Sequence, residues 1–236
     1  MRRAGQVVRE VLELVRSRVQ PGATTFDLEK TAQERLDQLS VKAAFKGYHG
    51  FPCVLCTSVN SEVVHGIPSP KRVLKEGDIV SVDFGVVVDG YYGDAAITVP
   101  VGKVNADAER LLKVTEASLH AGIAAVRPGA TLGDVGAAVQ GVVEREGFSV
   151  VRDFVGHGIG SQMHEEPQVP NFGQAGRGMK LRPGMVIAIE PMVNAGKPEV
   201  VVLDDGWTAV AKDGSMSAHF EHTVAVTATG SRILTE

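Results

Sequence analysis

The chain has 236 residues, of which 44% are hydrophobic and 22% charged, and its formal net charge is −4. This composition is typical of a globular protein with one large domain or two small ones. The chain has no dense block of Lys and Arg, so its sequence does not indicate nucleic-acid binding. No apolar run reaches the roughly 18 residues of a membrane span.

Two pairs of helices are expected. Apolar residues recur at helical spacing, Pro-Gly pairs interrupt the pattern, and Thr24 or Thr25 and, later, Thr131 are in position to cap the helices that follow. The basic N-terminus has acids among its apolar positions, so it is interpreted as a helix rather than a signal peptide. The four helices are expected over residues 3–19, 24–39, 107–126 and 131–147.

Between the helix pairs the sequence is rich in β-branched residues, which favours strands. Hairpin-joined strands predict an α+β fold with a curved antiparallel sheet whose one face is covered by helices. Residues 165–182 and 204–215 are expected to be loops. The strands are expected over residues 54–59, 79–88, 91–99, 150–154, 186–189, 200–203 and 221–226.

One sequence pattern occurs twice, 107 residues apart. LKEGDIVSVD ends at Asp83 and LRPGMVIAIE ends at Glu190, and the same offset relates residues 19–28 to 126–135. The repeat predicts a single catalytic domain, 1–236, built from two similar halves of about 1–103 and 104–236.

Each copy ends in an acid, and burying a carboxylate is costly unless a metal or proton partner holds it. Asp89-Gly90 predicts a two-residue hairpin in which the numbers of paired residues sum to 179. Asp83 and Asp94 then lie on one face as diagonal neighbours, with Cβ atoms about 7–8 Å apart. Such a pair can converge on a metal ion.

The second half offers a matching pair, Glu190 and Glu221. Four ionised carboxylates in one cavity would repel one another, and two divalent cations would neutralise them and create a hydrolytic site. The alternative is that these acids are surface residues at strand ends. His157 stands between glycines that allow close backbone approach, which favours a site role over a structural one.

The other histidines and the cysteines carry weaker signals. For His65, a role in the site and a purely structural role are equally open. His219 stands two residues before Glu221 and is expected to support the site from behind the ligands. His49, His120 and His222 have no predicted role. Cys53 and Cys56 are spaced C-x-x-C, but without a second pair they are interpreted as reduced thiols.

The motifs VVHGIPS, SVDFGVVVDGYYGDAAIT, GHGIGSQMHEEPQVPN, GMVIAIEPM and FEHTVAVT together resemble the type I methionine aminopeptidases of the pita-bread fold, over nearly the whole chain. The resemblance implies a centre of two divalent metal ions, which could be Co, Mn, Fe or Zn. It also implies two site histidines, His65 and His164, outside the metal shell. The implied ligands are Asp83, Asp94, His157, Glu190 and Glu221.

The resemblance further implies a pocket for the methionine side chain, lined by Tyr48, Cys56 and Trp207. Phe51 and Met163 also belong to this lining and depart from the enterobacterial pattern, where a tyrosine and an aromatic residue stand. Because Met is flexible and apolar, a pocket for a thioether should survive these changes.

The resulting hypothesis is a metal-dependent aminopeptidase that removes the initiator methionine when the second residue is small. Its nucleophile is a hydroxide bridging the metals, and the catalytic residues are His65, His164 and Glu190. The expected partners are nascent polypeptide N-termini, with transient ribosome association, and the expected state is a cytoplasmic monomer.

Two alternatives are an X-Pro aminopeptidase or prolidase-like enzyme and a metal-free peptide-binding protein of the same fold. The former usually carries a large extra N-terminal domain, and the latter usually loses ligands, whereas all five are present here.

Overall fold

A computed structural model describes residues 1–236 and contains the two expected pairs of helices. Thr24 and Thr131 cap the second helix of each pair, and each hydroxyl and the acid three residues later form a capping box. The bounds are α1 (Arg2–Arg16), α2 (Thr25–Leu39), α3 (Ala106–Ala125) and α4 (Leu132–Arg145), with a short 3₁₀ turn, η1, at Tyr48–Gly50.

Nine strands form one large sheet, in which every pairing is antiparallel. These strands are β1 (Lys42–Ala43), β2 (Leu55–Val59), β4 (Ile79–Val88), β5 (Tyr91–Pro100), β7 (Gly156–Gly158), β8 (Glu165–Val169), β9 (Val186–Ile189), β14 (Glu221–Val226) and β15 (Ser231–Ile233). Two three-stranded sheets contain β3 (Glu62–Val64), β6 (Ser149–Val150), β10 (Met192–Asn194), β11 (Val200–Val202), β12 (Ala209–Ala211) and β13 (Ser217–His219).

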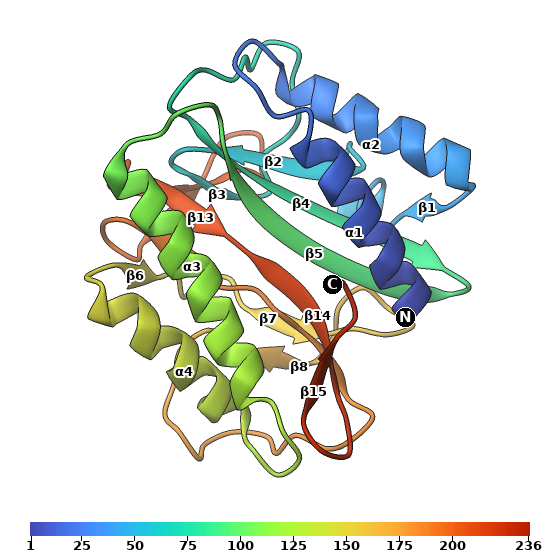
Figure 1. Cartoon of the computed structure of the whole chain (residues 1–236), viewed down its shortest axis with the longest axis vertical. Helices are drawn as coiled ribbons and strands as arrows, with labels where there is room; N and C mark the ends of the chain where they lie inside the picture. The colour runs from blue at the N-terminus through green and yellow to red at the C-terminus, as the bar shows by residue number, and fades with distance from the viewer.

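The two halves of the chain meet in the middle of the large sheet, whose main path is β1-β4-β5-β14-β9-β7-β8. Figure 1 shows β5 and β14 crossing the molecule between the α1–α2 pair and the α3–α4 pair. The hairpin register is as predicted, because Asp83 pairs with Ala96 and Gly85 pairs with Asp94. The expected antiparallel α+β architecture is therefore confirmed.

Three expectations from the sequence are wrong in detail. Of the expected strand 150–154, only Val150 is extended, as the second residue of β6 (Ser149–Val150). The expected loop 165–182 begins with β8, and the expected loop 204–215 contains β12. Each missed strand is five residues or shorter and depends on a neighbouring strand for its hydrogen bonds, so local sequence carries little signal for it.

The repeat seen in the sequence is also present in the backbone. An isolated bridge joins Thr24 to Val73, and another joins Thr131 to Lys180, with both partners 107 residues further along. Each bridge ties the start of a helix to the segment that precedes β4 or β9. The two copies therefore hold their acid-bearing strands against their helices in the same way.

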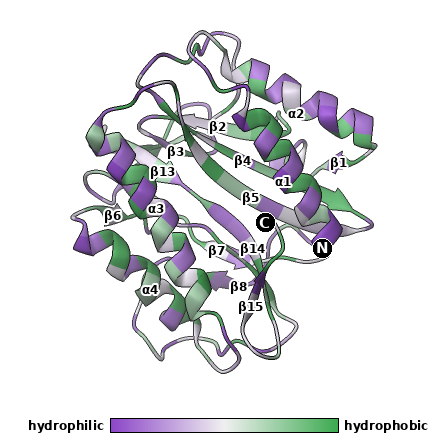
Figure 2. Ribbon diagram, in the orientation of Figure 1, coloured by the Kyte–Doolittle hydropathy of each residue, from purple (hydrophilic) through white to green (hydrophobic).

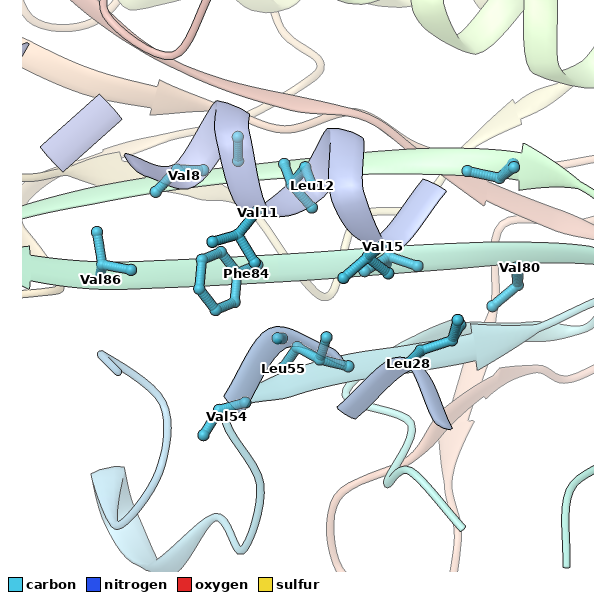
Figure 3. Packing of buried hydrophobic residues seen from close by; sticks show 14 of the residues in the cluster. Val8, Val11, Leu12, Val15, Leu28, Val54, Leu55, Val80, Phe84 and Val86 are labelled. Carbon is cyan, nitrogen blue, oxygen red and sulfur yellow. The ribbon is translucent and has the colours of Figure 1, made fainter. Parts of the chain in front are cut away.

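The hydrophobic core lies between the helices and one face of the sheet. Figure 2 shows hydrophobic and hydrophilic residues alternating along the helices, and Figure 3 shows side chains of α1 packed over strands β4 and β5. Phe84 and its alternate neighbours in β4 belong to this buried cluster. Because side chains alternate along a strand, Asp83 must point to the opposite face, away from the helices.

Candidate metal centre and catalytic cavity

A cavity of about 450 Å³ opens on the face of the sheet opposite the helices. All twelve site residues expected from the sequence line it, together with Phe45 and His49. The lining is Phe45, Tyr48, His49, Phe51, Cys56, His65, Asp83, Asp94, His157, Met163, His164, Glu190, Trp207 and Glu221.

Four acids reach the cavity from the central strands. Ala96 of β5 pairs with Asp83 of β4 on one side and with Glu221 of β14 on the other, so these two acids lie in one row. Asp94 is two residues from Ala96 and shares its face. Glu190 directly follows β9, which pairs with β14. Both halves of the repeat therefore contribute two carboxylates from neighbouring strands.

His157 brings an imidazole that lines the cavity close to two of these acids. Its Nδ1–H donates to the Gly158 carbonyl at 2.9 Å, which leaves Nε2 without a proton and facing the carboxylates. The distance from Nε2 is 3.6 Å to Glu190 Oε1 and 4.0 Å to Asp94 Oδ2. A Cβ on Gly158 would lie 2.3 Å from the Glu166 carbonyl oxygen, so β7 and β8 can approach this closely only at glycine.

Burial disfavours charge at every one of these groups. Burial, followed by the nearby acids, raises the pKa of Asp83, Glu190 and Glu221 well above their ordinary values. Burial raises the pKa of Asp94 to about 7, and burial followed by His164 lowers the pKa of His157 to about 4. His157 is therefore neutral at pH 7, which is the form that binds a metal.

The donor set fits divalent cations. Asp94, His157 and Glu221 each present a ligand atom within 4.8 Å of the others. Three buried carboxylate oxygens, one each on Asp83, Asp94 and Glu221, have no hydrogen-bond partner in the chain. Unpaired buried carboxylate oxygens are costly, and coordination to a cation is the arrangement that would satisfy them.

The remaining histidines surround this cluster at different depths. The ring of His164 lies 4.2 Å from that of His157, and its Nδ1 is 2.8 Å from the Tyr48 hydroxyl. His65 has a left-handed backbone, with φ of 62°, which is uncommon for a residue with a side chain and typical of functional sites. His219 is buried behind the cavity, with Nε2 3.7 Å from Glu190 Oε2, where it was expected to support the site.

The other wall of the cavity is apolar. Phe45, Phe51, Cys56 and Met163 belong to one buried cluster, and the Trp207 ring packs edge-on against Phe51 with centroids 5.2 Å apart. Both cysteines are free and buried, and burial raises the pKa of the Cys56 thiol well above its ordinary value. Reduced, protonated thiols at this wall agree with the sequence interpretation.

Phe45 and His49 were not expected in the site. Phe45 comes two residues after β1 in the chain, and no motif marks it. His49 has a left-handed backbone, with φ of 47°, between Gly47 and Gly50, which also have positive φ. A histidine framed by two glycines was the signal that could have found it, as it did for His157.

Residues 1–228 match the model of metallopeptidase family M24, and the chain belongs to that family. It is 53% identical to a methionine aminopeptidase A from Synechocystis, over 100% of this chain and 93% of the relative. A crystal structure of a methionine aminopeptidase from Thermotoga maritima has a TM-score of 0.99 at 51% identity, covering 100% of this chain and 95% of that one. Within family M24 the chain therefore belongs with the methionine aminopeptidases.

The pita-bread fold and the family expected from the sequence motifs are thus confirmed. A prolidase from Pyrococcus horikoshii also matches, with a TM-score of 0.77, but at 22% identity it shows the shared fold alone. This chain covers 60% of that prolidase. None of the helices is both long and apolar enough to cross a membrane.

Proposed function

We propose that this chain hydrolyses the peptide bond that follows an N-terminal methionine when the second residue is small. The main support for this proposal is the cavity, which has a buried carboxylate–histidine cluster on one wall and an apolar pocket on the other. An apolar pocket with a few converging polar groups is the usual form of a specific small-ligand site. The pocket would accept the methionine side chain while the cluster faces the scissile bond.

Two divalent metal ions would be held by the five predicted ligands. Asp83, Asp94 and Glu221 come from three adjacent strands, and His157 and Glu190 stand beside them, so the set can be shared between two ions. When bound, such ions lower the pKa of water and polarise a carbonyl. One imidazole among four carboxylates suits Mn, Fe, Co or Zn, and the metal in use depends on availability.

The residues around the ligands have separate proposed roles. The Tyr48 hydroxyl meets Nδ1 of His164, which orients the ring and leaves its Nε2 to donate to the oxyanion that forms from the scissile carbonyl. His65 positions the substrate near the scissile nitrogen and assists proton transfer there. Glu190 moves a proton between the attacking water and the leaving amine, and the buried His219 ring lies behind its second oxygen, with Nε2 3.7 Å away.

The proposed substrates are the N-termini of nascent polypeptides in the cytoplasm, reached with or without transient docking at the ribosome. The chain is expected to act as a monomer and as one catalytic domain. An X-Pro aminopeptidase of the same fold is the rival function. The apolar wall of phenylalanine, cysteine, methionine and tryptophan side chains favours a methionine side chain at the N-terminal position.

Release of the first residue from Met-Ala-Ser and from Ala-Pro-Ala separates these functions. Each peptide is incubated with the purified chain after chelation and after graded addition of Mn, Fe, Co or Zn. We expect the first residue to be released from Met-Ala-Ser but not from Ala-Pro-Ala, and only when metal is present. Release from Ala-Pro-Ala alone would establish the rival, and binding without hydrolysis at every metal concentration would indicate a peptide-binding protein.

Replacing Glu221 with Ala tests the metal centre itself. The change removes one buried ligand and should abolish turnover and lower the bound metal measured by elemental analysis. Near-wild-type activity in a preparation of known metal content would contradict the two-metal proposal.

A further inference from the structure

Glu29 is a buried acid outside the metal centre. It lies on the inner face of α2 with only 7% of its surface exposed. Its carboxylate accepts hydrogen bonds from the Val54 N–H, at 2.9 and 3.1 Å to its two oxygens, and from the Leu55 N–H at 3.2 Å. Its hydrogen-bond partners are thus backbone amides of another segment, and charge-assisted bonds of this kind are stronger than neutral ones.

The two amides belong to the segment that builds the apolar wall of the cavity. Leu55 begins β2, Phe51 and Cys56 on either side line the cavity, and Cys53 belongs to the same buried cluster. In β2, Cys56 pairs with Asp83 of β4. The position of this segment therefore sets both the apolar wall and its separation from the carboxylates.

The repeat shows that helix packing alone does not require an acid here. The position 107 residues after Glu29 is Gly136 of α4, where a Cβ would lie 2.4 Å from the Phe172 carbonyl oxygen and 2.7 Å from that of Pro170. The second half thus leaves no space for any side chain at this point. The acid is specific to the half that carries Phe51 and Cys56.

We propose that Glu29 is a positioning residue for substrate selection, which holds the Val54 and Leu55 amides so that Phe51 and Cys56 form the methionine side-chain wall. This inference rests on the proposed function. It assigns Glu29 no contact with the substrate, because it does not line the cavity. Its removal should loosen the wall and leave the metal ligands in place.

Glu29→Ala and Glu29→Gln test this role, with Glu34→Gln on the exposed face of the same helix as the matched control. Each variant is assayed on Met-Ala-Ser and Leu-Ala-Ser for kcat and KM, beside metal content and unfolding temperature. Trp207 is the only tryptophan in the chain and packs on Phe51, so its fluorescence reports directly on this wall.

Glu29→Ala is expected to raise KM for Met-Ala-Ser about tenfold, as for loss of one charge-assisted hydrogen bond, with a smaller change in kcat. Preference for Met over Leu should fall, Trp207 emission should shift, and metal content should stay constant. Glu29→Gln keeps one acceptor oxygen and should fall between Ala and wild type, and it decides the test if the Ala variant does not fold.

Two outcomes would overturn the inference. The first is a lower unfolding temperature with KM, selectivity and Trp207 emission unchanged, which would make Glu29 a purely structural residue. The second is a parallel loss of metal, which would place its effect at the metal centre. If wild-type protein leaves Met-Ala-Ser intact with every metal, the proposed function itself fails and this inference fails with it.

Discussion

Replacing Asp94 with Asn should stabilise the metal-free protein and remove the gain in stability that metal binding gives the wild type. Burial raises the pKa of Asp94 from its ordinary value of 3.8 to about 7. One pKa unit corresponds to about 1.4 kcal/mol, so keeping this carboxyl ionised in the folded chain costs about 4 kcal/mol at pH 8. Burying an Asn amide without full partners takes back about 1–3 kcal/mol. The net gain is then about 1–3 kcal/mol, or roughly 3–10 °C in unfolding temperature.

The sign of this effect follows from proton linkage. The folded pKa lies above the unfolded one, so the stability present below about pH 4 is lost as pH rises toward about 7. Metal-free wild type should lose stability over this window, and Asp94→Asn should lose less. Bound metal should reverse the order, because a ligand present at a hundred times its dissociation constant adds about 2.7 kcal/mol to wild type.

Calorimetry of both proteins, with chelator and with added Mn, at several values between pH 4 and pH 8 measures all of these quantities. Asp153→Asn, an exposed acid near the cavity strands, is the matched control and should change neither curve. A metal-free Asp94→Asn protein that unfolds at or below the wild-type temperature at pH 8 would refute the reasoning, since burial of the ionised Asp94 carboxyl would then carry no net cost.

Four further substitutions separate catalysis, metal binding and folding. His164→Ala should lower kcat about 100-fold, by loss of one oxyanion donor, while elemental analysis still finds metal bound; loss of metal would instead make this residue a ligand. Gly158→Ala places a Cβ 2.3 Å from a backbone oxygen and should cost about 1–3 kcal/mol and weaken metal binding in a titration. Gly141→Ala, with no atom within 4 Å of the new Cβ, should instead raise the unfolding temperature. Thr131→Ala should cost about 1 kcal/mol in denaturant unfolding by removing a helix cap, without changing KM.

The parts of the fold that could be predicted have local causes. Asp89-Gly90 determines a hairpin turn, and the turn determines the register that puts Asp83 and Asp94 on one face. Thr24 and Thr131 begin helices because each hydroxyl accepts a hydrogen bond from an amide three residues later. These signals depend on residues close in sequence, so they survive without knowledge of the rest of the chain.

The parts that could not be predicted are held by distant partners. Strands such as β7 and β12 have three residues each and exist because neighbouring strands supply their hydrogen bonds. His49 is a different case, because its place in the cavity follows from a local turn with positive φ, and the glycines on both sides of it were an overlooked signal. Glu29 gave no sequence signal either, since a helical Glu is ordinarily exposed and its two partners lie 25 and 26 residues away.

The four carboxylates of the site follow the internal repeat, and the residues that make its two sides different are found where the repeat fails. Its capping boxes, its bridges and its acid-bearing strands recur in both halves and make a nearly symmetric frame. His157 has no partner, because Gly50 stands 107 residues earlier, so two metal ions in this frame would have different surroundings. Glu29 likewise corresponds to Gly136 in the second half of the repeat. Only the half with Glu29 carries the wall formed by Phe51 and Cys56. A symmetric frame can hold two cations, but distinguishing an amine from a carbonyl, and methionine from other side chains, requires these departures from symmetry.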